Sequence, residues 1–334
     1  MKINKGTYSI SDLKWKDDSQ QEKDRIITIY NELKEKGLKK EFLSEHEKIF
    51  IFGTAQLLKG EQKYVHEYSF CDNPKFKFLY IVYSWDITGG SFYNKEKDVN
   101  VPTEEVQSDL KYLISKADEW EEVVLKENHS DQLLLQTAKE ARHDLKSLDS
   151  QPEFKERFSK GSFRYRYKRW AVLLNSKYIY HFSQEIWETF DFKPFVIQLF
   201  GEDIAINEHS LIHIFNRHFL KITKPYDPQK SFHNRNFDYR NIGRDLQLIF
   251  NVMSKVSNPL EYNMNNIFFR VRGTIYILYT SVQTKGENGF QKKFRRLDSF
   301  YPVEKDTNLK SIIENYEEII LGEEISIFKP KLSQ

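Results

Sequence analysis

Hydrophobic residues recur at the three- and four-residue spacing of amphipathic helices through much of the first 150 positions. Residues 20–37 form one such stretch, and residues 103–146 form a longer, densely charged one that is interrupted near His129. The sequence therefore predicts a helix, followed later by a helical hairpin, with a further helix at about 40–58. Two aromatic runs within residues 61–87 flank an Asn-Pro turn and predict a β-hairpin.

The pattern changes beyond residue 150, where basic and aromatic residues alternate. In FSKGSFRYRYKRW, residues 158–170, this alternation predicts a strand with one basic and one aromatic face. Such a strand suits a nucleic-acid backbone and its bases, and it equally suits a half-buried edge strand whose cations prevent aggregation. The nucleic-acid-binding candidates in this segment are Arg164, Arg166, Lys168 and Arg169.

Three strand candidates near the C-terminus predict an antiparallel β-meander. They are NIFFRV, TIYILYTSV and FQKKFRRLDSFYPV, with turns at Arg272-Gly273 and at TKGENG. Helices are expected before the meander at about 242–254 and after it at 308–323. The fold prediction is α+β: a mostly helical N-terminal region, 1–150, with a β-hairpin and no assigned role, and a domain at 151–334. In that domain, helices pack on the antiparallel β-meander, and its core covers about residues 205–305.

Composition narrows the possible partners. The net charge is +2, yet residues 151–300 carry 24 Lys and Arg against 14 Asp and Glu. This local excess indicates an anionic partner, although uneven surface charge is the simpler explanation. A single cysteine, Cys71, excludes an internal disulfide and a cysteine-based zinc cluster. No run of about 18 apolar residues and no apolar leader occurs, so we expect a cytoplasmic protein without a membrane partner.

The most informative stretch is HSLIHIFNRH, residues 209–218. Asn207 suits the N-cap of a helix, and Glu208 favours its first turn. On a helical wheel of ~100° per residue, the apolar residues form one face. The opposite face carries His209, His213 and Arg217, and His218 lies at the edge of the apolar face.

Three interpretations of this helix stay open. His209 and His213 have the i, i+4 spacing of two zinc ligands, but no third ligand and no His-Glu-x-x-His pattern accompany them. A hydrogen-bonded core histidine at position 218, with surface histidines elsewhere, is the simplest alternative. The third interpretation is catalytic, because an imidazole packed on one side and open on the other can act as a general base. The adjacent Arg217 would favour a phosphate.

The strands downstream favour the catalytic interpretation. Simple alternation places a set of cations and hydroxyls on one face of the last strand, namely Lys293, Arg295, Leu297, Ser299 and Tyr301. In the preceding hairpin, Arg270, Arg272 and Tyr276 are expected opposite the apolar set Phe269, Val271, Ile275 and Ile277. Such a face suits metal-free RNA cleavage. A base takes the proton of the ribose 2′-OH, cations stabilise the phosphorane, and an acid protonates the leaving 5′-oxygen.

At these residues the chain resembles the bacterial toxin nucleases of the barnase–EndoU–colicin–RelE-like (BECR) fold. The resemblance rests on HSLIHIFNRHF with its His-x-x-x-Arg-His signature, on FFRVRGTIYILYTSV, and on KKFRRLDSFYPV with Ser before Tyr-Pro. It covers about residues 205–305. It implies a metal-independent endoribonuclease that needs no cofactor and acts as a toxin or in defence against phage. The residues it points to are His213, Arg217, His218, Arg270 or Arg272, Ser299 and Tyr301.

We therefore expect RNA as the partner, with His218 as general base and His213 as the second histidine and candidate acid. Arg217, Arg270 and Arg272 would stabilise the phosphate, and Lys293 and Arg295 would add to nucleic-acid binding. An inhibitor or sensor protein is expected to bind through the N-terminal region. Two alternatives remain: a non-catalytic nucleic-acid-binding or regulatory protein that uses the basic strand alone, and a zinc hydrolase built on His209 and His213.

Overall fold

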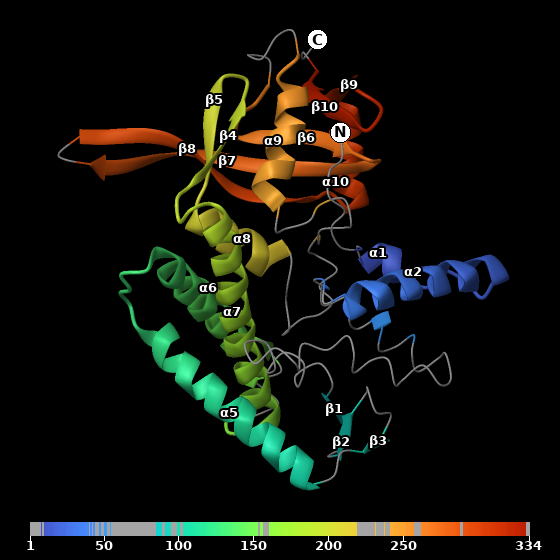
Figure 1. Ribbon diagram of the computed structural model, residues 1–334, viewed down its shortest axis with the longest axis vertical. Coiled ribbons are helices and arrows are strands. Elements are labelled where there is room, and N and C mark those ends of the chain that lie inside the picture. Colours follow the sequence, from blue (N-terminus) through green and yellow to red (C-terminus); the bar gives the residue numbers. More distant parts are fainter. Residues whose placement is uncertain are drawn as a thin grey trace. The chain divides into compact units, whose positions relative to one another are not determined.

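The computed structural model of the chain has an α+β fold (Figure 1). Its described residues divide into two compact units. We call the one that runs up to His181 the helical unit and the one from Phe182 onward the sheet unit. The predicted border at 150/151 lies within the helical unit. The structure describes residues 8, 10–39, 41, 43, 47, 50–51, 54, 85–88, 91–94, 99–100, 103–152, 154–155, 160–218, 231, 237, 241–256, 262–287 and 290–331.

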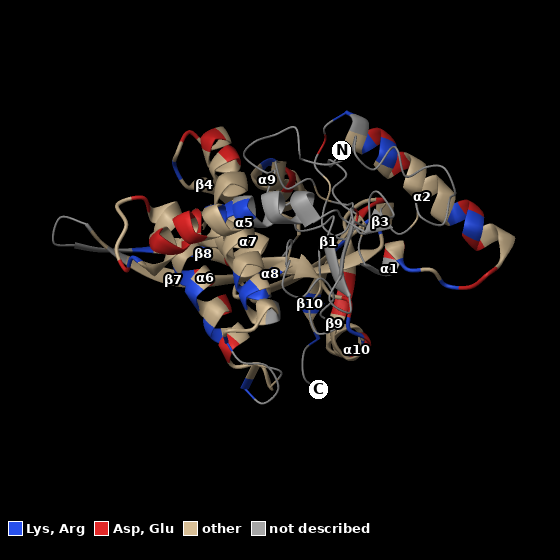
Figure 2. Cartoon of the chain, turned by 90° about the horizontal axis from the view of Figure 1, so that it is seen from below, with Lys and Arg blue, Asp and Glu red and all other residues tan. Residues whose placement is uncertain are grey.

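The helical unit confirms the helix predicted at residues 20–37 and the helical hairpin predicted at 103–146. Helix α2 (Gln20–Leu38) follows the short α1 (Ile10–Leu13). Ser19 is its N-cap, and the Ser19 hydroxyl accepts a hydrogen bond from the Glu22 amide. Acidic and basic residues are interspersed along α2 (Figure 2), as on an ordinary solvated helix face. The predicted helical hairpin consists of α5 (Thr103–Leu125) and α6 (Gln132–Asp149).

A small three-stranded sheet also belongs to the helical unit. It contains β1 (Trp85–Thr88), β2 (Ser91–Asn94) and β3 (Val99–Asn100) in that order. The β-hairpin predicted within residues 61–87 lies outside the described residues, except for its end, which is part of β1. Most of the helix predicted at about 40–58 is outside them as well.

The strand predicted over residues 163–170 is wrong, because this segment begins the long helix α7 (Phe163–Thr189). The alternation of basic and aromatic residues lasts only to Lys168, whereas residues 163–189 contain neither Gly nor Pro and so allow one continuous helix. The rings of Phe163 and Tyr167, one turn apart, stack with centroids 6.1 Å apart, and Trp170 begins a nearly continuous buried stretch. A helix buried on most sides has no amphipathic signature.

The sheet unit is built on a seven-stranded sheet in the order β4-β5-β8-β7-β6-β10-β9. All neighbouring pairs are antiparallel except β5 and β8, which are parallel. The predicted meander is confirmed as β6, β7 and β8. The strands are β4 (Phe195–Leu199), β5 (Glu202–Ile206), β6 (Asn266–Val271), β7 (Thr274–Glu287), β8 (Phe290–Pro302), β9 (Tyr316–Ile320) and β10 (Ile325–Pro330).

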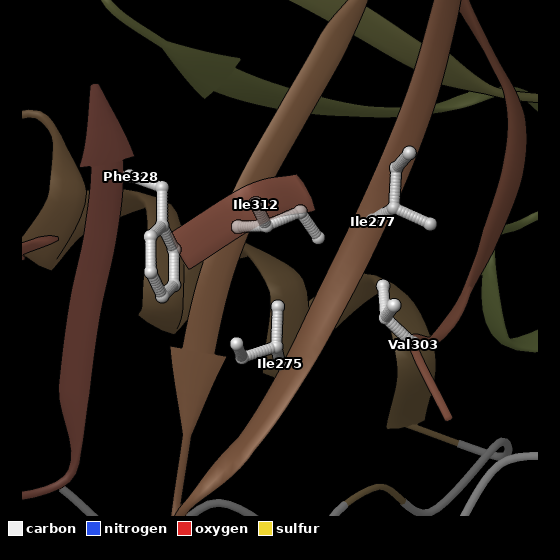
Figure 3. Close-up of a cluster of buried hydrophobic side chains, with 5 residues drawn as sticks. All are labelled: Ile275, Ile277, Val303, Ile312 and Phe328. Atoms are coloured by element: carbon white, nitrogen blue, oxygen red, sulfur yellow. The ribbon is translucent and has the colours of Figure 1, made fainter. Parts of the chain in front are cut away.

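The two faces of this sheet have separate cores. On one face, Phe269 contacts Phe250 of α9 (Ile242–Met253), the helix predicted at 242–254. The opposite face packs against α10 (Asp306–Asn315), where Ile312 meets Ile275, Ile277, Val303 and Phe328 (Figure 3). Burial of both faces gives the central strands few exposed positions, which fixes their register.

Two turns and one helix end refine the prediction. Arg272 and Gly273 have φ of 46° and 81°, the left-handed pair that a two-residue β-hairpin needs between Val271 and Thr274. The helix predicted over 308–323 is wrong in its second half. It ends at Asn315, and the Tyr- and Ile-containing segment after it forms β9, which pairs with β10.

Candidate active site

Helix α8 (Glu208–His218) carries the histidine-rich stretch and lies along β8. The side chain of Asn207 accepts the Ser210 amide, which confirms the predicted N-cap. The Ser210 hydroxyl donates to the carbonyl of Leu297 on β8, so the first turn of the helix is attached to the strand. Because Leu211, Ile214 and Phe215 are fully buried, packing also fixes the rotation of the helix about its axis.

The last residue of α8, His218, is held on both ring nitrogens and on its ring face. Nδ1 lies 3.1 Å from the carbonyl oxygen of Ser231, and Nε2 lies 3.1 Å from Oγ of Ser299. A carbonyl oxygen can only accept a hydrogen bond, so Nδ1 carries the proton. In the neutral ring, Nε2 is therefore the basic nitrogen, and it accepts the hydroxyl of Ser299.

The ring of Tyr301 stacks on His218 with centroids 4.1 Å apart and an interplanar angle of 18°. Burial raises the pKa of the Tyr301 phenol, and the hydrogen bond and charge of Tyr279 raise it further. The phenol therefore keeps its proton through neutral pH. We call His218, Ser299 and Tyr301 the β8 cluster, and the structure brings these three predicted site residues together.

A β-bulge changes the face that the rest of β8 presents. Tyr279 pairs with Ser299 and Thr280 pairs with Leu297, so Asp298 has no partner on β7. The alternation predicted along the strand is therefore wrong. Ser299 and Tyr301 share their face with Arg296 and Phe294, whereas Lys293, Arg295 and Leu297 lie on the other.

Arg295 has a structural partner set on that other face. Its Nε lies 2.6 Å from Glu202, and its Nη1 lies 2.9 Å from Asn265 and 3.0 Å from Thr280. Its side chain is 12% exposed, which leaves little of it for a nucleic acid. Lys293 is exposed, but it does not share the face of the β8 cluster.

The two arginines of the β6–β7 hairpin are not at the β8 cluster. Arg270 forms a two-pronged ion pair with Glu318 of β9, and Arg272 pairs with Glu324. Arg270 on β6 pairs with Ile275 on β7, and Ser299 on β8 pairs with Tyr279, four residues along β7 from Ile275. Arg270 and Ser299 are therefore also two strands apart. The Cα of Arg270 thus lies ~16 Å from that of Ser299. The expected face is also wrong, because Tyr276 aligns with Phe269 in the buried core.

The other residues of α8 point around the helix from His218. The rings of His209 and His213 stack with centroids 5.6 Å apart, which confirms that they share a face. His213 is ~140° around the helix from His218, and Arg217 is ~100° from it. The structure thus does not direct the two predicted catalytic histidines to one point. Among the described residues, no group of three His, Cys, Asp or Glu side chains could hold a metal ion.

The basic residues predicted on a strand belong to α7 in the helical unit. Arg166 is exposed, Lys168 lies over the ring of Phe154 at 4.9 Å, and Arg169 pairs with Glu121. The side chain of Arg164 is outside the described set. The row of four cations is therefore distributed around a helix, and two of its members have partners within the unit.

Comparisons with known proteins add no family to this geometry. No family model, no curated protein and no solved structure matches the chain. Within the described part of the chain, no helix combines the length and apolar character required to cross a membrane.

The sequence-based prediction missed three contributors to the site. Tyr279 is the cross-strand partner of Ser299, the Ser231 carbonyl holds Nδ1 of His218, and Arg296 shares the face of Ser299. Tyr279 could have been found from the pairing of the two predicted strands. The other two depend on a loop and on a bulge, which alternation does not encode.

Proposed function

We propose that the chain is a metal-independent endoribonuclease that cleaves RNA by transesterification through the ribose 2′-OH. The observation that carries this proposal is the arrangement of His218, whose Nε2 is the basic nitrogen and faces the Ser299 hydroxyl. An oriented imidazole whose basic nitrogen faces a hydroxyl is what proton abstraction from a hydroxyl requires. The nucleophile is already part of the substrate, so the protein has to supply only a base, an acid and charge stabilisation.

The proposed reaction has two proton transfers. Nε2 of His218 takes the proton of the 2′-OH, and the resulting oxygen attacks the adjacent phosphorus. The P–O5′ bond breaks, the 5′-oxygen receives a proton, and a 2′,3′-cyclic phosphate remains on the other fragment. Tyr301 is the proposed acid because its ring stacks on His218 and its phenol is protonated at neutral pH, while its raised pKa makes it a weak acid and limits its contribution to the rate. Ser299 positions the scissile group as the substrate hydroxyl replaces it at Nε2.

Charge stabilisation in this scheme comes from Arg217, next to His218 in the last turn of α8. Arg270 and Arg272 have no role in it. Arg270 pairs with Glu318 on β9 and Arg272 pairs with Glu324 in the turn after β9, both away from the β8 cluster. A role as a toxin or as an effector of defence against phage is consistent with such chemistry. The N-terminal region would then bind the protein that inhibits or triggers cleavage.

The experiment is incubation of the purified full chain with RNA in EDTA, followed by analysis of the fragment ends. Cleavage with 2′,3′-cyclic phosphate ends is expected, and His218→Ala should abolish it while thermal unfolding changes little. Fragments with 3′-hydroxyl ends, or cleavage that EDTA stops, would contradict the proposal. A variant that unfolds instead would support His218 as a core histidine, with a cost of ~1–4 kcal/mol.

A second candidate function is acyl transfer with Ser299 as the nucleophile. The Oγ–Nε2 distance of 3.1 Å and the carbonyl on Nδ1 match the order of a serine–histidine pair with an orienting group. Ser299 is only 8% exposed and lies within a strand, which limits the approach of an acyl group. Covalent labelling of Ser299 by a fluorophosphonate would favour this candidate, and a protein that cleaves RNA but is not labelled at Ser299 would exclude it.

A further inference from the structure

The two edges of the seven-stranded sheet differ in how their outward backbone groups are satisfied. β4 forms one edge and β9 forms the other (Figure 1). Leu199 pairs with β5 just before a two-residue turn, so the amides of Gln198 and Phe200 point away from β5. Gln247 of α9 accepts the Gln198 amide at 3.2 Å. Ser254, at the end of α9, accepts the Phe200 amide at 3.4 Å, so α9 protects this edge from a further strand.

In the described part of the chain, β9 presents an open edge. The Leu321 amide donates to the Ile325 carbonyl, so residue 321 and every second residue before it direct their backbone groups toward β10. The backbone groups of Tyr316, Glu318 and Ile320 therefore point away from β10, where the described sheet ends. Ile320 is also 79% exposed, more than any other large hydrophobic residue that the structure describes. An open edge with an exposed apolar side chain is a template for another strand.

The sequence of β9 is complementary to itself in one antiparallel register. If Glu318 lies opposite Glu318 of a second copy, Tyr316 lies opposite Ile320, and Glu317 lies opposite Ile319. An aromatic ring against a β-branched side chain is a favourable cross-strand pair, and it would cover Ile320. The Tyr316 amide already donates to the last turn of α10. The remaining outward amides and carbonyls of β9 would form about four hydrogen bonds between the copies.

The charge at the centre of this register is already neutralised. Two carboxylates directly opposite each other repel, which would exclude a pair of free glutamates at this position. Each Glu318 is instead held by Arg270 in a two-pronged ion pair at 2.7 and 2.9 Å, and it also accepts the Ser326 hydroxyl. The β9 strands of two copies can therefore meet without an uncompensated charge between them.

We infer that β9 is an interface at which two copies of the chain join their sheets across a two-fold axis. The assembly stops at two copies, because the same strand serves both and α9 covers the other edge. A strand of 5 residues buries little area, so the association is weak and depends on concentration. β9 is four strands from β8, about 19 Å, so pairing leaves the β8 cluster open and does not depend on the proposed function.

The two edge strands supply a matched pair of variants. Ile320→Glu removes the apolar contact with Tyr316 of the second copy and adds a carboxylate beside the axis, so the dissociation constant of the dimer should rise at least ~10-fold. Val196→Glu on β4, where the valine is 48% exposed, should leave it unchanged. Sedimentation equilibrium of the full chain, from micromolar to millimolar concentration, measures both. Because both positions are exposed, urea denaturation at low concentration should show that both variants stay folded.

A second pair of variants tests the register. Arg270→Met leaves two uncompensated carboxylates at the axis and should raise the dissociation constant about 2- to 5-fold at neutral pH. Arg272→Met, whose partner Glu324 lies in the turn after β9, should not. Equal effects of these two substitutions would overturn the register centred on Glu318. A wild-type chain that stays monomeric at every concentration, or equal effects of Ile320→Glu and Val196→Glu, would overturn the interface. None of these outcomes depends on RNA cleavage, so the two proposals fail separately.

Discussion

Two polar clusters on the same sheet differ in the partners that their side chains have. In the β8 cluster, His218 contacts a backbone carbonyl and a serine hydroxyl. In the cluster of Arg270, Glu318 and Ser326, which we call the β9–β10 cluster, the guanidinium and the carboxylate neutralise each other, and Ser326 donates to the same carboxylate. An imidazole nitrogen that faces a hydroxyl can exchange a proton with it, whereas a matched ion pair holds strands together.

The largest expected effect is on RNA cleavage by His218→Ala. Loss of a general base reduces the rate by about 10²- to 10⁴-fold. His143→Ala is the matched control, because this histidine is on α6 with its side chain 65% exposed. Single-turnover cleavage rates of both variants measure the difference. If both variants retained the wild-type rate, His218 would contribute no more to cleavage than the exposed His143.

A smaller effect is expected from the buried serines, one in each cluster. Ser299→Ala removes the hydroxyl at Nε2 of His218, so cleavage should fall by about 10- to 100-fold. Ser326→Ala removes a hydrogen bond to Glu318, so it should lower the free energy of unfolding by about 1 kcal/mol without changing cleavage. Rates and urea denaturation of both variants test this. If Ser299→Ala and Ser326→Ala lost equal activity, the loss would follow from lower stability and not from the contact of Ser299 with His218.

A third pair of variants, at two glycines of the sheet unit outside both clusters, compares a crowded position with an open one. A Cβ on Gly243 of α9 would lie 2.8 Å from the ring of Phe195 on β4, so Gly243→Ala should cost ~1–3 kcal/mol. A Cβ on Gly322, in the turn between β9 and β10, meets no atom within 4 Å, and Gly322→Ala should change stability by less than ~0.5 kcal/mol. Urea denaturation measures both. Cleavage by Gly243→Ala at a temperature where it stays folded should match the wild type, which separates loss of stability from loss of chemistry.

The sequence predicted the elements with strong local signals. The helix of residues 209–218, its cap at Asn207 and the three strands of the meander follow from apolar periodicity and from turn residues such as Gly273. The contact of His218 with Ser299 followed from combining these elements with the BECR resemblance, although the two residues are 81 positions apart. One further signal was available and unused, since Phe200-Gly201 with alternating apolar residues on each side forms the β4–β5 hairpin.

Other features depend on tertiary contacts that no local pattern carries. A short basic–aromatic alternation could not outweigh the absence of helix breakers in residues 163–189, and the segment folded as α7. Asp298 has no partner in the register with β7, and this one extra residue places Lys293 and Arg295 on the other face of β8. The carboxylates that pair with Arg270 and Arg272 come from a segment predicted as helix or left unassigned, so these arginines looked available for phosphate.

The smallest expected effect concerns the ion pair of the β9–β10 cluster. The hydrogen bond from Arg270 lowers the pKa of Glu318, burial partly opposes this, and Ser326 adds to the lowering. A carboxyl whose pKa is lower in the folded state stabilises the fold above its unfolded pKa of about 4.3, and that contribution is lost as pH falls. Because both side chains are about one-third exposed, Arg270→Met should lower the free energy of unfolding by only ~0.5 kcal/mol at pH 7.

The difference in the free energy of unfolding between Arg270→Met and the wild type should close near pH 3. Glu318→Gln combined with Arg270→Met should cost no more than either variant alone. A gap that stays constant from pH 7 to pH 3, measured by urea denaturation, would show that Arg270 stabilises β6 through its contact with the Phe328 ring rather than through charge.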